Sequence, residues 1–262
     1  LARYEQLLRG VAALSGLFST NESPYIDSRF VEKLFADTSG GRDLGRADCS
    51  FDVVLDGGVG VGVKTFLGGT GYMKREKVAE FTTLARLGRF RTKDVATLAE
   101  RVALARNTRI LSDVEEHSID LDRSAYHCLI RLPGGAVVHE EPFRLIDIDR
   151  LRPTDERGRK KSDWGLIEEG IYFTDGVNHY SYSTSKNVLM KRFEFDRSKN
   201  FIDLSIHPRP FDLLLNLVHR DGRREKAVVS MTSGRGETDA AVIRGRDFVV
   251  LPLYSTKTGE VP

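Results

Sequence analysis

The chain of 262 residues contains few cysteines and no long hydrophobic run. Cys49 and Cys128 both lie among apolar residues, so we expect two buried free thiols, which suits a reducing cytoplasm. No Cys and His residues have the spacing of zinc ligands. No segment approaches the about eighteen apolar residues of a membrane-spanning helix, and no basic-then-apolar leader marks secretion. We therefore expect a cytoplasmic protein without a membrane partner.

The chain also lacks an excess of charge of either sign. Its 40 Lys and Arg residues and 38 Asp and Glu residues leave a net charge of +2. The basic residues are nevertheless bunched, in the runs RGRKK (157–161), KR (191–192) and HRDGRREK (219–226). One such run is usually a solvated loop. Three runs in one half of the chain favour a polyanionic partner.

The first half of the chain mixes helical and strand patterns. Apolar spacing predicts helices over 3–16 and 27–37, the second capped by Asp27 or Ser28. Residues 51–56 and 61–67 predict two strands around a glycine turn. Residues 74–105 predict two helices with breaks near Gly88 and Arg91, the second capped by Thr92.

The second half is mostly β. Apolar and β-branched runs predict strands at 126–132, 136–141, 143–149, 201–207, 226–231 and 247–255, a hairpin over 170–184 and a short helix over 208–218. We therefore expect an α/β (α+β) protein, with a mixed sheet flanked by helices over residues 1–150. A β-rich region over 151–262 follows it, either separate from the first region or continuous with it.

The segment FDVVLDGGVGVGVKTF (51–66) is the richest in glycine. A phosphate-binding loop requires GxxxxGK followed by Ser or Thr and a helix, but Gly62 lies one residue too far from Lys64. The valines at 59, 61 and 63 alternate with the period of a strand. The pattern therefore predicts a hairpin, in which glycine clears space for a ligand.

This hairpin places two chemically useful side chains on adjacent strands. Gly62 and Lys64 share one strand face, and Asp52 lies on the preceding strand, which Asp56 ends. Glu80 follows on the helix predicted over 74–88, near its core-facing boundary. A carboxylate and a lysine are thereby predicted to meet over an open surface.

The order helix, Asp on a strand, x-x-Lys on the next strand, helix resembles the core of the PD-(D/E)xK nuclease superfamily, in particular its type II restriction endonucleases. The resemblance covers roughly residues 27–132 and is carried by Asp52 and Gly62-Val63-Lys64. Gly62 stands where the family has an acid. Some members carry that carboxylate on the following helix, which makes Glu80 the natural substitute, with Glu76 or Asp56 as the other candidates.

The resemblance implies a restriction-endonuclease-like fold and Mg²⁺- or Mn²⁺-dependent hydrolysis of double-stranded DNA. Its implied catalytic residues are Asp52, Lys64 and Glu80, and its implied metal ligands are Asp52, Glu80 and Glu32, the last by its position on the first helix. Mg²⁺ prefers oxygen ligands and lowers the pKa of a bound water. Lys64 would orient or deprotonate that water. Since two strands must be cut, we expect a homodimer.

Polar and basic residues gather near the predicted 170–184 hairpin. Hydroxyl, imidazole and cationic groups of this kind make phosphate and base-edge contacts, and Ser183 to Ser185 are placed to cap a helix beginning at Lys186. The predicted DNA-binding residues are His179, Tyr182, Ser183, Thr184, Ser185, Lys186, Lys191 and Arg192.

Two other functions stay open from the sequence. With Gly62 in place of the acid, the chain could be a non-catalytic nucleic-acid-binding module with a degenerate nuclease fold. The glycine-rich segment also leaves a nucleotide-binding enzyme as a third candidate.

Overall fold

The computed structural model describes residues 2–45, 49–69, 71–219, 243–244 and 249–250. Residues 1–210 and 211–262 form two compact units. The described chain is mixed α/β, with five α-helices, a six-stranded mixed sheet and a five-stranded antiparallel sheet. The helices are α1 (Ala2–Ala13), α2 (Ser28–Ser39), α3 (Thr82–Arg86), α4 (Val95–His117) and α5 (Pro210–His219), with 3₁₀ turns at η1 (Ser15–Leu17) and η2 (Ile148–Arg150).

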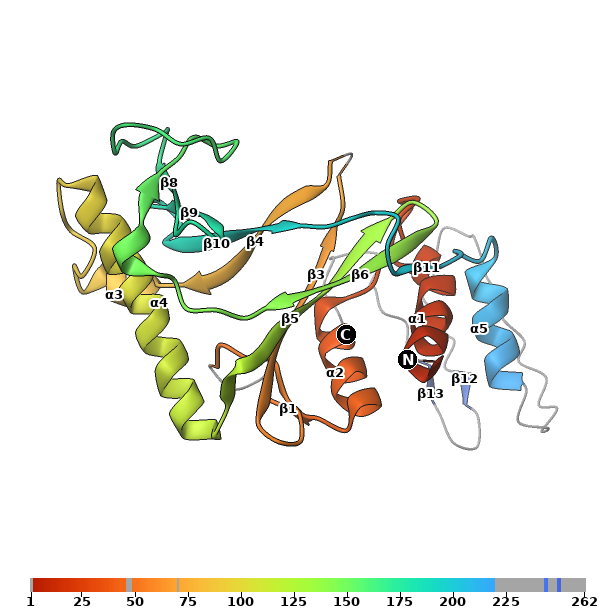
Figure 1. Ribbon diagram of the computed structural model, residues 1–262. Helices are drawn as coiled ribbons and strands as arrows, with labels where there is room; N and C mark the ends of the chain where they lie inside the picture. Colours follow the sequence, from red (N-terminus) through yellow and green to blue (C-terminus); the bar gives the residue numbers. More distant parts are fainter. Residues whose placement is uncertain (1, 46–48, 70, 220–242, 245–248, 251–262) are drawn as a thin grey trace, which may run out of the picture. The chain divides into compact units, whose positions relative to one another are not determined.

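The six-stranded sheet has the order β1-β2-β3-β5-β6-β11. Only β3 and β5 run parallel; the other neighbours are antiparallel. A parallel pair needs a long crossover, and here β4, α3 and α4 lie between the two strands in sequence (Figure 1). Its strands are β1 (Arg42–Asp43), β2 (Val53–Val54), β3 (Val59–Leu67), β5 (Asp120–Leu132), β6 (Gly135–Pro142) and β11 (Phe201–Asp203).

Side chains of residues 61–67 alternate between the two faces of the six-stranded sheet, as predicted, and each face has its own hydrophobic core. Val61 and Val63 pack with α1 and α2 on one face of the six-stranded sheet. On the other face, Phe66 packs against Tyr126 of β5 and Phe193 of the second sheet. The predicted cap of α2 is confirmed, because Asp27 accepts hydrogen bonds from the backbone N–H groups of Arg29 and Phe30. Lys64 therefore faces the space between the two sheets.

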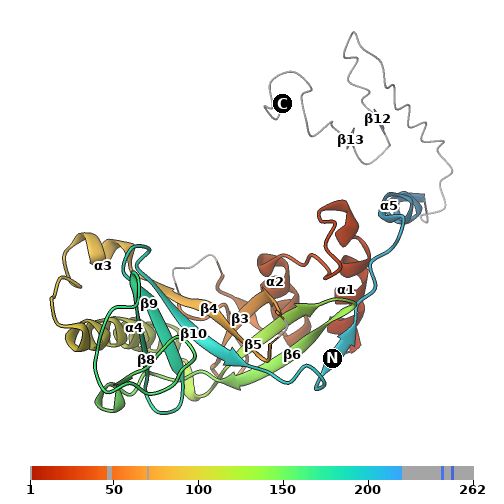
Figure 2. The same cartoon turned by 90° about the horizontal axis from the view of Figure 1, so that it is seen from above.

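The five-stranded sheet has the order β4-β10-β9-β8-β7. Helix α4 packs on it through Leu98, Ala99 and Val102, at the end of the unit opposite α1 and α2 (Figure 2). Its strands are β4 (Met73–Glu80), β7 (Arg152–Pro153), β8 (Gly170–Thr174), β9 (His179–Ser183) and β10 (Val188–Glu194); β12 (Ile243–Arg244) and β13 (Val249–Val250) form a separate pair. Because β4 pairs with β10, the boundary predicted near residue 150 falls inside the first compact unit.

Several predicted elements are wrong. The helix predicted over 74–88 is strand β4 followed by the short α3, so Glu80 ends a strand. The strand predicted over 143–149 is irregular and ends in η2. The helix expected to begin at Lys186 is a turn between β9 and β10, with Asn187 at a φ of 55°. Asp94, rather than Thr92, caps α4. The strand predicted over 226–231 lies outside the described residues.

Two further predictions concern the cysteines and membrane-spanning helices. Cys49 and Cys128 are both free thiols, Cys128 buried and Cys49 half-buried. In the described part of the chain, no helix is long and apolar enough to cross a membrane.

Candidate active site

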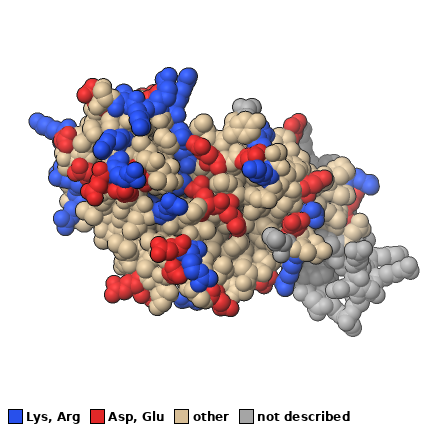
Figure 3. All heavy atoms as spheres, viewed as in Figure 1, with Lys and Arg blue, Asp and Glu red and all other residues tan. Residues whose placement is uncertain are grey.

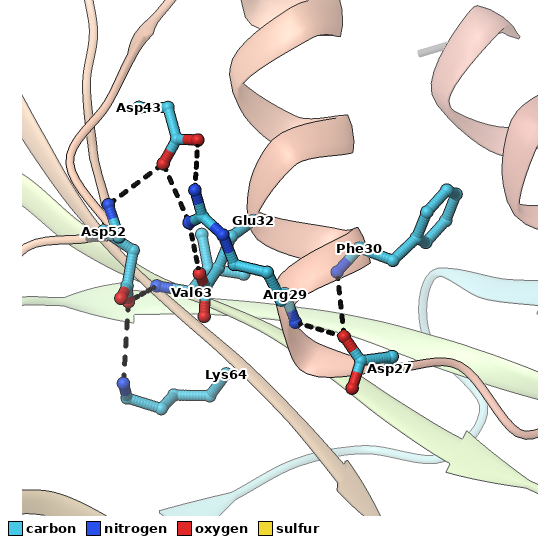
Figure 4. A network of polar contacts seen from close by, with 9 residues as sticks. Asp27, Arg29, Phe30, Glu32, Asp43, Asp52, Val63 and Lys64 are labelled. Carbon is cyan, nitrogen blue, oxygen red and sulfur yellow. Dashed lines mark hydrogen bonds and ion pairs between the residues drawn. The ribbon is translucent and has the colours of Figure 1, made fainter. Parts of the chain in front are cut away.

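Asp52 and Lys64 meet on adjacent antiparallel strands. Asp52 directly precedes β2, and its backbone N–H donates to the carbonyl oxygen of Val61 on β3. Its carboxylate accepts a hydrogen bond of 2.7 Å from the backbone N–H of Val63. The same Oδ2 atom lies 3.6 Å from Nζ of Lys64 (Figure 4). The predicted convergence of these two side chains is therefore present.

The charge state of Lys64 follows from its surroundings. Burial by itself lowers the pKa of this lysine, but nearby negative groups, Asp52 first and Glu32 among the others, raise it further than burial lowers it. The net pKa is above the ordinary value, so Lys64 is a cation at neutral pH. Its side chain is 25% exposed, which leaves the ammonium able to meet an anionic ligand.

Glu32 approaches this pair from α2. It accepts a hydrogen bond of 2.7 Å from Arg29, which also binds Asp43 (Figure 4). Burial raises the pKa of Glu32, the Arg29 hydrogen bond opposes this, and the charge of Asp52 raises it again. A Cβ at Gly45 would displace the ends of the Arg29 and Glu32 side chains, so this glycine leaves room for the ion pair. The hydrogen bond from Arg29 thus fixes the carboxylate of Glu32 near Asp52.

A cavity of about 420 Å³ opens beside Asp52 and Lys64. Its cations are Lys64, Lys77 of β4, and Arg106 and Arg109 of α4, against the carboxylates of Asp52 and Glu80. This excess of positive charge suits an anionic ligand. The remaining lining residues are Cys49, Ser50, Val78, Ala79, Thr82, Thr83, Ile110 and Phe143.

Arg106 is the most firmly held of these cations. It is 2% exposed and donates to the carbonyl oxygen of Arg144 at 2.8 Å and to the hydroxyl of Tyr126 at 3.0 Å. Its Nε is buried with no hydrogen-bond partner among the described residues. Arg106 is not among the site residues predicted from the sequence; its only signal there is its place four residues after Val102, on the apolar face of the predicted helix.

The candidate replacement acids differ in position. Glu80 lines the cavity but is exposed and binds Lys77 at 3.2 Å and Thr82 at 3.1 Å. Burial raises the pKa of Glu76, and the charges of Lys74 and Lys64 oppose this. The charge of Lys64 thus acts on Glu76, whereas the Glu80 carboxylate is engaged by Lys77. Asp56 is exposed in the turn between β2 and β3.

The space beside Gly62 is filled. A Cβ at this position would lie 2.9 Å from the ring of Tyr126 and 3.1 Å from that of Phe143. Tyr126 pairs with Gly62 across the parallel strands and stacks on Phe143 at 4.4 Å. The glycine predicted to clear space for a ligand instead makes room for a tyrosine.

The donor set bears on the predicted metal site. The described residues contain no group of three His, Cys, Asp or Glu side chains that could hold a metal, so Asp52, Glu80 and Glu32 do not converge as a three-carboxylate set. Mg²⁺ is often held by one or two carboxylates, with water and phosphate completing its shell. Asp52 and Glu32 fit that smaller set, since a cation would offset both the burial and the charge of Asp52 that raise the pKa of Glu32.

The predicted DNA-binding residues lie in the β9–β10 hairpin, and their exposure differs. Tyr182 is buried and its hydroxyl donates to Asn187 at 3.1 Å, so it does not face DNA. The side chain of Lys191 is 3% exposed and binds Glu141, so it is not a surface contact either. Burial lowers the pKa of the half-buried His179, and the charge of Arg192 lowers it further. The residues of the connecting turn and its flank are Ser183, Thr184, Ser185 and Lys186.

Replacement of Lys191 tests this correction. We expect Lys191→Ala to lower the free energy of unfolding by about 3 kcal/mol, because it leaves the largely buried Glu141 without its cation. Urea unfolding measures the change, and DNA affinity of the folded protein should stay the same. Lys186→Ala, in the exposed turn, is the control and should change stability by less than about 0.5 kcal/mol. Weaker DNA binding at unchanged stability would instead show that Lys191 contacts DNA.

Comparison with known proteins identifies no relative. No family model matches the sequence, no curated protein matches it, and no solved structure matches the fold.

Proposed function

We propose that this protein is a metal-dependent endonuclease that hydrolyses phosphodiester bonds of double-stranded DNA, as restriction enzymes do. The observation that carries the proposal is the Asp52–Lys64 contact of 3.6 Å at the wall of a cation-rich cavity. The order α2, β2, β3 around this contact, with β1 between α2 and β2, supports the resemblance to the PD-(D/E)xK nucleases; β4 and α3 stand between β3 and the next long helix, α4. Because duplex DNA has two strands, we also propose that two copies act together.

Each residue of the site has a separate role in the proposed reaction. Mg²⁺ or Mn²⁺ held by Asp52 and Glu32 would neutralise phosphate charge and lower the pKa of a water. The Val63 N–H fixes the orientation of the Asp52 carboxylate. Lys64, as a cation, hydrogen-bonds the phosphate oxygens that gain charge in the transition state. Lys77 and Arg106 offset the charge of the incoming DNA backbone.

Plasmid cleavage tests the proposal. We expect supercoiled DNA to be nicked or linearised in the presence of Mg²⁺ or Mn²⁺ and to stay intact in EDTA. Asp52→Asn should remove cleavage, since an amide keeps the Val63 hydrogen bond but not the negative charge. Intact plasmids from several methylated and unmethylated sources, at every metal concentration, would contradict an endonuclease.

The filled space at Gly62 favours one second candidate, a DNA-binding module without catalysis. Titration calorimetry with Mn²⁺ separates the two. An endonuclease should bind Mn²⁺, and Asp52→Asn should abolish the heat; a non-catalytic module should give none.

The Mn²⁺ affinity measured by this titration is expected to depend on pH. The folded-state pKa of Glu32 is raised, so Glu32 takes up a proton at a higher pH than an ordinary glutamate as pH falls. Mn²⁺ affinity should therefore weaken from that higher pH downward, because a proton must leave before the metal binds. In Glu32→Gln this step should disappear. The same pH profile in wild type and variant would remove Glu32 from the metal site.

A further inference from the structure

Two arginines face each other on the five-stranded sheet, outside the candidate active site. Arg75 of β4 and Arg192 of β10 are direct cross-strand partners. Like charges opposite each other on a sheet are destabilising unless something offsets them. Of these two arginines, only Arg192 is among the residues predicted from the sequence to bind DNA.

Neighbouring groups accept hydrogen bonds from only some of the N–H donors of these arginines. The Arg75 guanidinium lies over the ring of Tyr172, 5.1 Å from its centre, and donates to the carbonyl oxygen of Glu156. Arg192 donates to the carbonyl oxygen of Arg157 at 3.0 Å and pairs with Glu194 at 2.6 Å. A guanidinium has five N–H donors. The Nε atoms of both arginines are buried without a hydrogen-bond partner in the described part of the chain.

A small cavity opens beside the two arginines. Its volume is about 230 Å³, and it is lined by Met73, Lys74, Arg75 and Arg192. As direct cross-strand partners, Arg75 and Arg192 point to the same face of the sheet. The space-filling view shows many Lys and Arg side chains in the region of the five-stranded sheet and its loops (Figure 3).

The carboxylates nearby do not balance this charge. Glu194 pairs with Arg192 but is itself 61% exposed. Burial lowers the pKa of Arg75 and the charge of Arg192 lowers it further, while Tyr172, Glu156 and Asp155 oppose this only in part. An anion in the cavity would supply the missing negative charge.

We propose that Arg75 and Arg192 bind a phosphate group, and that this phosphate belongs to the DNA backbone. Paired arginines with unused donors suit the tetrahedral oxygens of a phosphate. Strand β4 connects the two cavities, since its first residues line this one and Lys77 to Glu80 line the other. With a rise of about 3.3 Å per residue, Lys77 in the first cavity lies roughly 7 Å along β4 from Arg75. The proposal rests on the proposed function.

Binding of a 20-base-pair duplex in EDTA, followed by fluorescence polarisation at several salt concentrations, tests the DNA assignment. We expect Arg75→Gln to weaken binding about tenfold and to reduce the slope of log K against log salt by about 1, the loss of one phosphate contact. Arg131→Gln is the matched control: Arg131 is also half-buried, stacks on a tyrosine (Tyr25) and has an unpartnered Nε. It should bind DNA as wild type does. Equal affinity of Arg75→Gln and wild type would overturn the proposal.

Thermal melting in inorganic phosphate, against chloride at the same ionic strength, separates free phosphate from DNA. We expect phosphate to raise the Tm of wild type and of Arg131→Gln, but not of Arg75→Gln. Arg192→Gln should behave as Arg75→Gln does, and its Tm in chloride reports whether it folds. A phosphate shift that depends on Arg75, with unchanged DNA binding, would overturn the DNA assignment and leave a free-phosphate site. A wild-type protein that neither binds nor cuts DNA would overturn the proposed function, whereas cleavage unaffected by Arg75→Gln would overturn only this inference.

Discussion

Replacement of Lys64 by methionine is expected to lower kcat for DNA cleavage by about 10²–10³-fold, the usual effect of removing one charged donor from a transition state. Methionine keeps the apolar stem of the side chain and removes only the ammonium. The ammonium lies 3.6 Å from Asp52 and is kept protonated by the surrounding carboxylates. Single-turnover cleavage of a labelled duplex measures the effect.

The affinity for DNA should change much less than the rate. Lys77, Arg106 and Arg109 still line the cavity in this variant, so we expect Kd within about threefold of wild type in EDTA. Lys33→Met, at an exposed position of α2, is the control and should cleave normally. Normal cleavage by Lys64→Met would remove Lys64 from the site. An equal loss of rate and affinity would assign Lys64 to binding instead.

The Asp52–Lys64 pair could be predicted because its determinants are local. The alternation of Val59, Val61 and Val63 fixes a strand, and the glycines that follow Asp56 fix the turn. A two-strand hairpin with this register brings position 52 beside position 64. The cap of α2 at Asp27 was equally local, since one side chain and two backbone N–H groups decide it.

Strand β4 could not be predicted in the same way. Its sequence, MKREKVAE, is rich in good helix formers, and its strand conformation comes from pairing with β10, far along the chain. Strand propensity depends on such partners more than on the residue itself. The error carried over to the site, because a helix would have placed Glu80 near the core. On the strand, Glu80 is exposed and binds Lys77, while the charge of Lys64 acts on Glu76.

Two of the predicted DNA-binding residues are buried and so cannot contact DNA. Almost nothing in a sequence signals that a polar residue will be buried. Lys191 reads as a surface cation, yet Glu141 of the other sheet binds it and the ring of Phe193 lies 4.6 Å from its Nζ. Arg106 is a second buried cation. It is 2% exposed on the apolar face of α4, where it donates to Tyr126 and lines the cavity. Both outcomes depend on which strands meet across the sheet interface.

Restoring the acid that the nuclease motif has at position 62 is expected to destabilise the protein. We expect Gly62→Glu to cost on the order of 5 kcal/mol, combining overpacking with burial of a poorly compensated charge. The cause is specific: even a Cβ would lie 2.9 Å from the ring of Tyr126, which is itself 1% exposed. Urea unfolding gives the free energy, and cleavage should fall rather than rise.

A second substitution separates lack of space from an unfavourable charge. In Gly62→Glu combined with Tyr126→Ala, the tyrosine ring no longer occupies the space, and the new carboxylate lies on the same strand face as Lys64. The double variant should therefore be more stable than the sum of the two single changes predicts, by about 1–3 kcal/mol. If Gly62→Glu does not fold, Gly62→Ala with Tyr126→Ala completes the same cycle. Additivity within about 0.5 kcal/mol would mean that the two residues do not compete for this space. Gain of cleavage in the double variant alone would mean that Tyr126 is what keeps the acid out of this site.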